Sequence, residues 1–217
     1  MKIRVVESVL KANDAVAQEN RRVLDDAGVL AVNLMSAPGS GKTTLLEKTI
    51  SLVGPDKCAV LVGDLQTSRD AERLNAAGAE TVQINTGKGC HLSATQVAEG
   101  LTGLDLKEKR YVFIENVGNM VCPAGFDLGE HQRAVLLSVP EGDDKVAKYW
   151  TLFQLADIIL LTKTDLIEIL DFNIAAVKTD LEKINTHAPL LEISSRIDET
   201  LESWMAWLSQ AGVVKKN

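Results

Sequence analysis

Seven short runs of mostly apolar residues recur along the chain and are typical of β-strands. They occupy residues 29–35, 58–62, 81–84, 111–114, 134–139, 157–161 and 189–193. In most of these runs the apolar residues follow one another instead of alternating with polar ones, which suits strands covered on both faces. The pattern therefore predicts a mostly parallel sheet with helices on both sides.

Helical segments are expected between these strands. The apolar spacing of residues 42–52, 69–77 and 92–101 is that of helices, and each segment follows one of the first three strands. An amphipathic leading helix is expected at about residues 3–26, where apolar residues stand among polar and charged ones. The alternation predicts an α/β fold with a doubly wound, mostly parallel sheet, in which residues 1–217 form a single domain.

Composition and charge narrow the class of partner without changing this fold. The formal charge is −7 and the sequence has no basic tract, so nucleic acid is not an expected partner. No apolar run approaches the roughly 18 residues that span a bilayer, and we expect a cytoplasmic protein that does not bind membranes. Three cysteines are too few for a disulfide framework, so each thiol is judged by its own position.

A glycine-rich turn between the first strand and the next helix is typical of a phosphate-binding Walker A loop. Ser36 stands where the G-x-x-x-x-G-K-S/T pattern has its first glycine, but the rest of the pattern is intact. Backbone N–H groups and the positive end of the following helix bind phosphates in such loops. Lys42 is expected to reach the β- and γ-phosphates. The predicted nucleotide-binding residues of this loop are Pro38, Gly39, Ser40, Gly41, Lys42, Thr43 and Thr44.

A second nucleotide-binding element is predicted after the strand at residues 157–161. Thr162, Lys163 and Asp165 resemble the guanine-reading N-K-x-D element of GTPases, with threonine in place of asparagine. The aspartate of that element accepts hydrogen bonds from groups that guanine has and adenine lacks, so Asp165 is expected to select GTP. A plain helix cap is the alternative interpretation. An accessory base-contacting loop is expected at Ser194, Ser195 and Arg196.

Acidic side chains are expected beside the phosphate loop, because open α/β sheets bind ligands at the carboxyl ends of their strands. Asp64 and Glu115 each follow a predicted strand, and with Thr43 they are the predicted magnesium ligands. Asp64 or Asp70 is expected to orient the attacking water, and the Gly118 N–H group to sense the γ-phosphate. No arginine finger is obvious, so slow, magnesium-dependent hydrolysis is expected. The predicted catalytic residues are Lys42, Asp64, Asp70, Glu115 and Gly118.

Two further loops carry residues that bind soft metal ions. Cys90 and His91 follow the third predicted strand, and Cys122 follows the fourth. Both loops leave the same edge of the sheet, and two thiolates with one imidazole suit Zn²⁺ or Ni²⁺. The spacing matches no standard zinc-finger pattern, so inert thiols stay an open alternative. Cys58 lies inside an apolar strand and is expected to act as a small core residue.

Taken together, these segments resemble the hydrogenase nickel-incorporation GTPases of the HypB family, which belong to the SIMIBI class of P-loop GTPases. The resemblance covers nearly the whole chain and is carried by residues 36–46, 63–67, 70–73, 87–92, 115–123, 126–130 and 141–145. It implies that Cys90, His91 and Cys122 bind nickel or zinc, with GTP and Mg²⁺ as cofactors. It also implies a GTP-dependent homodimer that acts with a small zinc-containing maturation protein on the hydrogenase large-subunit precursor.

The resemblance also suggests where the homodimer forms. Residues 141–149 are the first candidate contact segment, and Lys148 within it is expected to reach the partner's nucleotide. A helix with Trp150, Leu152, Phe153 and Leu155 is the second candidate segment. Ordinary helix core and solvated charge are the alternative interpretation of both segments.

Three other functions stay open at this stage. A urease-accessory nickel GTPase shares the fold, but that family has a compact Cys-Pro-His motif, whereas here Pro123 and Ala124 follow Cys122. A metal-independent GTP switch that recruits a partner would leave the thiols incidental. A P-loop kinase acting on a small molecule is disfavoured by the guanine-reading element.

Overall fold

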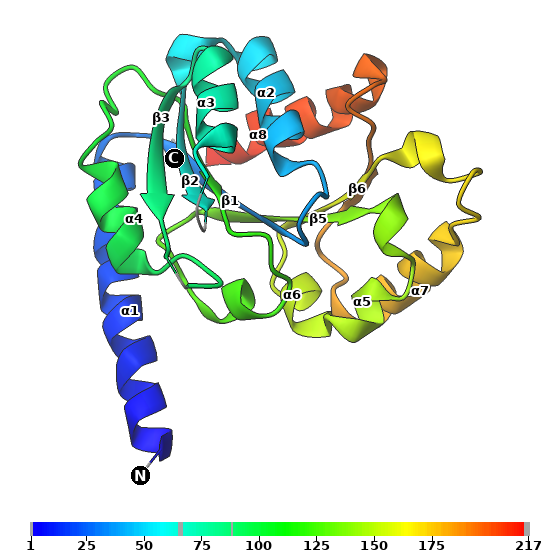
Figure 1. Cartoon of the computed structure of the whole chain (residues 1–217), viewed down its shortest axis with the longest axis horizontal. Coiled ribbons are helices and arrows are strands. Elements are labelled where there is room, and N and C mark those ends of the chain that lie inside the picture. The colour runs from blue at the N-terminus through cyan, green and yellow to red at the C-terminus, as the bar shows by residue number, and fades with distance from the viewer. Residues whose placement is uncertain (1, 65–66, 88, 215–217) are drawn as a thin grey trace.

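The computed structural model describes residues 2–64, 67–87 and 89–214 and places a wholly parallel sheet at the centre of the molecule (Figure 1). Its strand order is β3-β2-β4-β1-β5-β6-β7. The strands are β1 Leu30–Ser36, β2 Cys58–Asp64, β3 Glu80–Asn85, β4 Tyr111–Glu115, β5 Gln132–Ser138, β6 Ile158–Thr162 and β7 Leu190–Glu192. Each of the predicted strands is confirmed to within a few residues.

Helices cover both faces of this sheet. Helices α2, α3 and α8 pack on one face, and α1 and α4 with α5, α6 and α7 pack on the other. The α-helices are α1 Lys2–Asp26, α2 Lys42–Val53, α3 Arg69–Ala76, α4 Ala94–Leu101, α5 Lys145–Lys148, α6 Trp150–Gln154, α7 Ile174–Ile184 and α8 Glu202–Val214. Short 3-10 helices occur at η1 Pro55–Lys57, η2 Cys122–Gly125, η3 Val139–Glu141, η4 Thr164–Leu166 and η5 Asp198–Leu201. The predicted doubly wound α/β fold is confirmed.

The continuous apolar character of the strands follows from this two-sided cover. In β2, Val60 packs in the core under α2, α3 and α8, while its neighbour Leu61 packs under α1 and α4. Cys58 is fully buried in the first of these cores, and burial raises the pKa of its thiol to about 12. Cys58 is therefore an unreactive core residue.

One predicted helix begins later than its apolar pattern indicates. Residues 92–101 have helical spacing, but α4 begins at Ala94 because Ser93 caps it. The Ser93 hydroxyl accepts a hydrogen bond from the Gln96 N–H, and the Gln96 side chain accepts one from the Ser93 N–H. Leu92 is thereby left outside the helix and packs against Gly63, where an added Cβ would lie 2.8 Å from the Leu92 Cγ atom.

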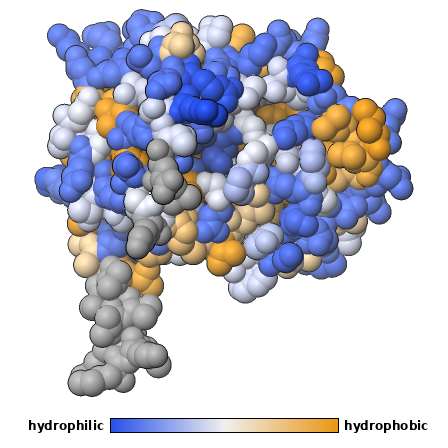
Figure 2. Space-filling view, in the orientation of Figure 1, coloured by the Kyte–Doolittle hydropathy of each residue, from blue (hydrophilic) through white to orange (hydrophobic). Residues whose placement is uncertain are grey.

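The face shown in Figure 2 is mostly hydrophilic, with a compact hydrophobic patch at its right-hand edge, over the segment that follows β6. Ile169 and Leu170 are the exposed large apolar residues of that segment. Within the part of the chain that the structure describes, no helix has the length and hydropathy needed to cross a bilayer.

Candidate functional site

The turn between β1 and α2 has the backbone of a phosphate cradle. Gly39 and Gly41 have φ angles of 76° and 98°, in the left-handed region that favours glycine. Lys42 begins α2 and is buried, and its Nζ atom donates a hydrogen bond to the Ser36 Oγ atom at 2.8 Å. Burial lowers the pKa of Lys42, although the carboxylate of Glu115 opposes this shift. The serine that replaces the first Walker glycine therefore holds the lysine.

A cavity of about 460 Å³ opens beside this turn, a size that suits a bound small molecule. It is bounded by the phosphate loop, by the ends of β2 and β4, and by α3. Its lining includes the predicted residues Pro38, Gly39, Gly41, Lys42, Thr43, Thr44, Asp64, Asp70, Glu115, Gly118 and Lys163. Residues from five separate stretches of sequence thus meet at one edge of the sheet.

Glu115 is the buried acid of this cavity. Its Oε1 atom accepts a hydrogen bond from the Thr43 hydroxyl at 2.7 Å, and its Oε2 atom is buried without a hydrogen-bond partner among the described residues. Burial raises the pKa of Glu115 to about 7, against the opposing effect of Lys42. A hydroxyl and a partnerless buried carboxylate oxygen are ligands that Mg²⁺ prefers. Thr43 and Glu115 therefore fit a magnesium ion beside the phosphates.

Glu115 should make the nucleotide-free protein less stable as the pH rises from about 4.5 to about 7. A carboxyl group whose pKa is raised by folding favours the folded state while it is protonated, and this contribution disappears as the pH passes its folded pKa. The loss over this range should be about 3 kcal/mol, from roughly 1.4 kcal/mol per pKa unit. Urea unfolding without Mg²⁺ at about pH 4 and about pH 8 measures it. Glu115→Gln should remove this dependence, and equal dependences in both proteins would contradict the explanation.

Other charged groups surround the phosphate side of the cavity. Asp64 accepts a hydrogen bond from the Thr67 hydroxyl at 2.6 Å, and Asp70 lies 3.6 Å from Arg73 within α3. Arg73 lines the cavity and forms an ion pair with Glu47 at 2.6 Å, which raises the pKa of its guanidinium group. No role is predicted for Arg73 from the sequence. The sequence feature that could have identified Arg73 is its spacing of three residues from Asp70, which places both side chains on one face of a helix.

The predicted guanine-reading segment lies against the phosphate loop. Lys163 donates a hydrogen bond to the Gly39 carbonyl oxygen at 2.7 Å, and the Thr162 hydroxyl donates one to the Ser40 carbonyl oxygen at 2.7 Å. Lys163 has a φ angle of 59°, an uncommon left-handed conformation for a lysine. Thr162 thus supplies a hydrogen bond to the loop from the position where the N-K-x-D element has asparagine.

The accessory turn completes this side of the site. The Ser194 hydroxyl donates a hydrogen bond to Asp165 at 2.7 Å, and the Arg196 N–H donates one to the Ser194 oxygen at 3.3 Å. Ser195 lines a small hollow of about 70 Å³ together with Thr162. The structure therefore brings the two predicted base-contacting segments together, while the Arg196 side chain is exposed.

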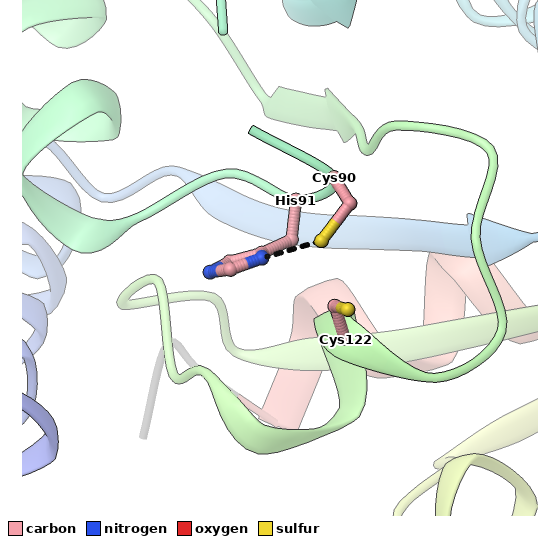
Figure 3. A group of neighbouring side chains, drawn as sticks. All are labelled: Cys90, His91 and Cys122. Carbon is pink, nitrogen blue, oxygen red and sulfur yellow. Dashed lines mark hydrogen bonds between the residues drawn. The ribbon is translucent and has the colours of Figure 1, made fainter. Parts of the chain in front are cut away.

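Cys90, His91 and Cys122 form a compact group (Figure 3). Their ligand atoms all lie within 4.8 Å of one another, and the Cys90 Sγ atom is 3.5 Å from the His91 Nδ1 atom. Cys90 is exposed, and the other two are partly buried. A hydrogen bond with Cys122 raises the pKa of the Cys90 thiol, whereas burial lowers the pKa of His91 and keeps its imidazole neutral. A bound divalent ion would instead lower the pKa of the Cys90 thiol, because metal binding deprotonates cysteine.

Asn116 connects this group with the cavity beside the phosphate loop. It directly follows Glu115 and lines the cavity, and its Oδ1 atom accepts hydrogen bonds from the N–H groups of Val117 (2.9 Å) and Leu92 (3.2 Å). Leu92 directly follows His91, so one buried amide joins the acidic loop to the metal-ligand loop. Asn116 has no role predicted from the sequence, although it stands inside the Glu115 to Gly118 motif.

Gly118 also makes a close contact with the phosphate loop. A Cβ atom at Gly118 would lie 2.9 Å from the Pro38 Cα atom, closer than real Cβ atoms approach. The Asn119 side chain, one residue further on, donates a hydrogen bond to the Cys90 carbonyl oxygen at 3.1 Å. The loop that follows β4 therefore contacts both the phosphate loop and the loop that carries Cys90.

Comparison with known proteins gives the family. The CobW/HypB/UreG nucleotide-binding domain matches residues 30–192. The hydrogenase maturation factor HypB of Azotobacter vinelandii is 46% identical over 209 residues, which are 96% of this chain and 69% of that protein. This chain belongs to the HypB family.

Solved HypB structures share its fold. The structure of HypB from Helicobacter pylori in complex with nickel is 41% identical, has a TM-score of 0.90, and covers 93% of this chain and 95% of its own. HypB from Archaeoglobus fulgidus is 38% identical with a TM-score of 0.87, covering 94% of this chain and 100% of its own. The predicted family and the SIMIBI-type P-loop fold are confirmed. Leu65, Gln66 and Lys88, which belong to two segments of the HypB resemblance, lie outside the described residues.

Proposed function

We propose that this chain is a GTP-hydrolysing metallochaperone that binds nickel or zinc and assists nickel insertion into the precursor of a nickel–iron hydrogenase. The observation that carries the proposal is the group of Cys90, His91 and Cys122, with ligand atoms within 4.8 Å, beside a phosphate-binding cavity. The names of the HypB relatives and the nickel complex of the Helicobacter pylori protein support this assignment.

The nucleotide half of the proposal assigns GTP to the cavity. Lys42 holds the β- and γ-phosphates, and the Gly118 N–H group contacts the γ-phosphate. Thr43, Asp64 and Glu115 hold Mg²⁺, which neutralises charge on the outer phosphate oxygens when bound. The segment with Asp165 and the turn at Ser194, Ser195 and Arg196 contact the base. Either Asp64 or Asp70 orients the attacking water.

The metal half of the proposal assigns a transferable cargo to the cysteine group. Two thiolates and one imidazole suit Ni²⁺ and Zn²⁺ and suit Mg²⁺ poorly. A structural zinc site has four protein ligands, whereas these three leave one position for water or for a ligand of a receiving protein. Cys90 is the most exposed of the three ligands, which suits release of the metal ion to a partner protein.

We further propose that nucleotide binding and metal binding are linked. A γ-phosphate that moves the Glu115 to Gly118 loop also moves Asn116, which bonds to Leu92 beside the ligand His91. Any change in metal affinity caused by nucleotide requires an equal, reciprocal change in nucleotide affinity caused by metal. The linkage gives GTP hydrolysis a means to release the cargo.

The proposed assembly is a GTP-dependent homodimer that works with a small zinc-containing maturation protein and the hydrogenase large-subunit precursor. Lys148 is exposed and remains a candidate for reaching the partner's nucleotide. Trp150 and Leu155 are also exposed, at 52% and 40%. Leu152 and Phe153, however, are fully buried in the core of the chain itself, so their predicted place in a dimer contact is wrong.

Metal titration tests the proposal. Ni²⁺ or Zn²⁺ should bind the wild-type protein with an affinity that changes when a non-hydrolysable GTP analogue is present. Cys90→Ala or Cys122→Ala should weaken binding on the order of 100-fold or more, because a two-ligand site remains. Cys58→Ala is the matched control, since this buried thiol lies outside the group, and it should bind metal as the wild type does.

The other outcomes select among the remaining functions. Unchanged binding in the Cys90→Ala and Cys122→Ala proteins would remove the metal site and leave a metal-independent GTP switch. Metal binding that is lost in these variants but insensitive to nucleotide would overturn the linkage alone. Tighter binding of ATP than of GTP would instead indicate a small-molecule kinase.

A further inference from the structure

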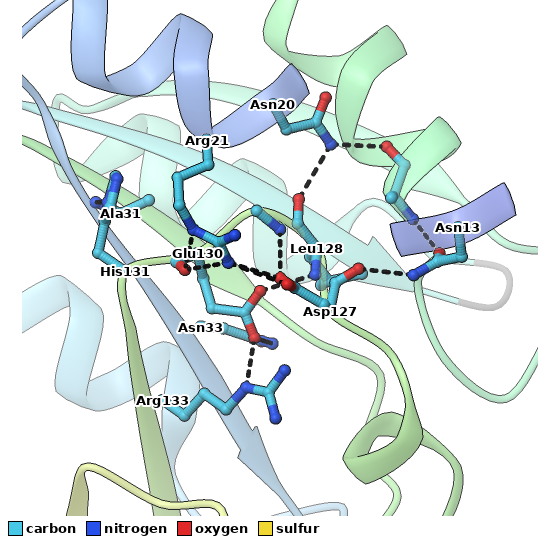
Figure 4. A network of polar contacts seen from close by, with 12 residues as sticks. Asn13, Asn20, Arg21, Ala31, Asn33, Asp127, Leu128, Glu130, His131 and Arg133 are labelled. Atoms are coloured by element: carbon cyan, nitrogen blue, oxygen red, sulfur yellow. Dashed lines mark hydrogen bonds and ion pairs between the residues drawn. The ribbon is translucent and has the colours of Figure 1, made fainter. Parts of the chain in front are cut away.

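Two buried asparagines of α1 each join the same pair of segments (Figure 4). Asn13 accepts a hydrogen bond from the Ala94 N–H at 2.9 Å and donates one to the Asp127 carbonyl oxygen at 2.8 Å. Asn20 donates to the carbonyl oxygens of Ala94 at 2.8 Å and Leu128 at 2.9 Å. Because both side chains are buried, their loss leaves these backbone groups without ready access to water.

Further contacts hold α1 against the second of these segments. Arg21 forms an ion pair with Asp127 at 2.8 Å and donates a hydrogen bond to the Glu130 carbonyl oxygen at 3.0 Å. Gly129 lies so close that a Cβ atom there would be 2.6 Å from the Ala17 carbonyl oxygen. The backbones of α1 and of residues 127–130 therefore pack closely together. These contacts hold the helix that carries both asparagines in place.

The two joined segments are the continuations of the two ligand-bearing loops. Ala94 begins α4, shortly after His91, and Asp127 follows the short η2 helix that begins with Cys122. Phe126, next to Asp127, packs its ring against the His91 ring with 3.9 Å between centroids. Residues on α1 thus add to the direct contacts of Asn116, Asn119 and Phe126 that hold the two ligand loops together.

We propose that Asn13 and Asn20 are positioning residues of the metal site, because they tie the start of α4 to residues 127–128 and so fix the spacing of the ligand loops. The inference rests on the proposed metal function. A metal ion binds most tightly to ligands that are already held at its preferred geometry, and groups that orient ligands affect affinity strongly. Replacing either asparagine keeps all three ligands in the chain. It removes a connection between the start of α4 and residues 127–128, so the ligand loops can move apart.

Asn13→Asp distinguishes the bridge between the two segments from the hydrogen bond that Asn13 makes to the first N–H group of α4. The aspartate keeps an oxygen that accepts from the Ala94 N–H, and a negative charge is favourable at a helix start. It cannot donate to the Asp127 carbonyl oxygen, so the bridge between the segments is broken. Asn20→Ala removes the second bridge.

The test is a Ni²⁺ titration of the full-length protein, followed by thiolate-to-metal charge-transfer absorption. We expect Asn13→Asp and Asn20→Ala to lower Ni²⁺ affinity on the order of 10- to 100-fold and to shift the absorption band. GTP affinity measured without metal should stay as in the wild type, since neither asparagine lines the cavity.

Asn185→Ala is the matched control. Asn185 is another buried asparagine that joins backbone groups, donating to the carbonyl oxygens of Phe153 at 2.8 Å and Ala156 at 2.9 Å, but it contacts neither ligand loop. This variant should lose stability as Asn20→Ala does while keeping the wild-type Ni²⁺ affinity and absorption band.

The remaining outcomes each count against the inference. Wild-type affinity and an unchanged band in both α1 variants would overturn the positioning role and leave the metal function standing. Equal losses in Asn185→Ala would show that general destabilisation explains the effect. An unchanged Ni²⁺ affinity and an unchanged band in both Cys90→Ala and Cys122→Ala would overturn the metal function, and the positioning role with it.

Discussion

Replacing Lys42 with alanine should lower GTP hydrolysis on the order of 10²- to 10³-fold, the loss typical of one group aimed at transition-state charge. Its ammonium group is buried beside the cavity and directed by Ser36, whereas Lys163 is already bonded to the Gly39 carbonyl oxygen. Because burial lowers the pKa of Lys42, its charge weakens the fold, and the variant should unfold at nearly the wild-type urea concentration. Phosphate release and urea unfolding measure the two effects.

Lys48→Ala is the control for this change. Lys48 lies in the same helix α2, is partly exposed, and pairs with Asp198 at 2.8 Å, so its loss should cost about 1 kcal/mol or less and leave hydrolysis unchanged. A Lys42→Ala protein that still hydrolysed GTP at the wild-type rate would show that this turn is not the phosphate site.

Replacing Asp165 with alanine should abolish the preference for GTP over ATP. The carboxylate accepts a hydrogen bond from the Ser194 hydroxyl at 2.7 Å. In the proposed GTP site it also accepts hydrogen bonds from guanine's N–H groups. A site built around such hydrogen bonds rejects analogues that cannot form them, so GTP affinity should fall on the order of 100-fold or more while ATP affinity stays low. Competition of the two nucleotides against a fluorescent analogue gives both values.

An aspartate on α7 provides the comparison for base selection. Asp180 pairs with Lys183 on the surface, so Asp180→Ala should keep the wild-type preference for GTP. An undiminished preference in Asp165→Ala would mean that another group reads the base and that the 162–165 segment serves as a helix cap.

The sequence predicted the sheet and the place of the site because both depend on short-range patterns. Apolar runs such as residues 111–114 identify strands buried on both faces, and polar residues that follow them meet where parallel strands end. Glu115 and Lys42 could therefore be placed in one cavity from their positions alone. The raised pKa of Glu115, about 7, could not be predicted in this way, because it arises from burial by surrounding elements.

Features that depend on contacts between distant elements escaped the sequence analysis. A polar residue on an amphipathic helix is expected to face water, yet Asn13 and Asn20 are buried against backbone groups more than 70 positions away. Leu152 and Phe153 are adjacent apolar residues of a short helix, and their sequence positions alone suit a partner contact as well as the chain's own core. Only the packing of α6 against β5 and β6 assigns them to the core.

The uniform direction of the strands has an evolutionary consequence. The parallel strands that bound the cavity end at the same edge of the sheet, and the residues of the proposed nucleotide site and of the proposed metal site follow them in separate stretches of sequence. Under the proposed function, substitutions in the loops that carry Cys90, His91 and Cys122 can change the metal preference without altering a strand. Proteins descended from one ancestor can then differ in the metal they bind while they keep the same nucleotide-binding fold.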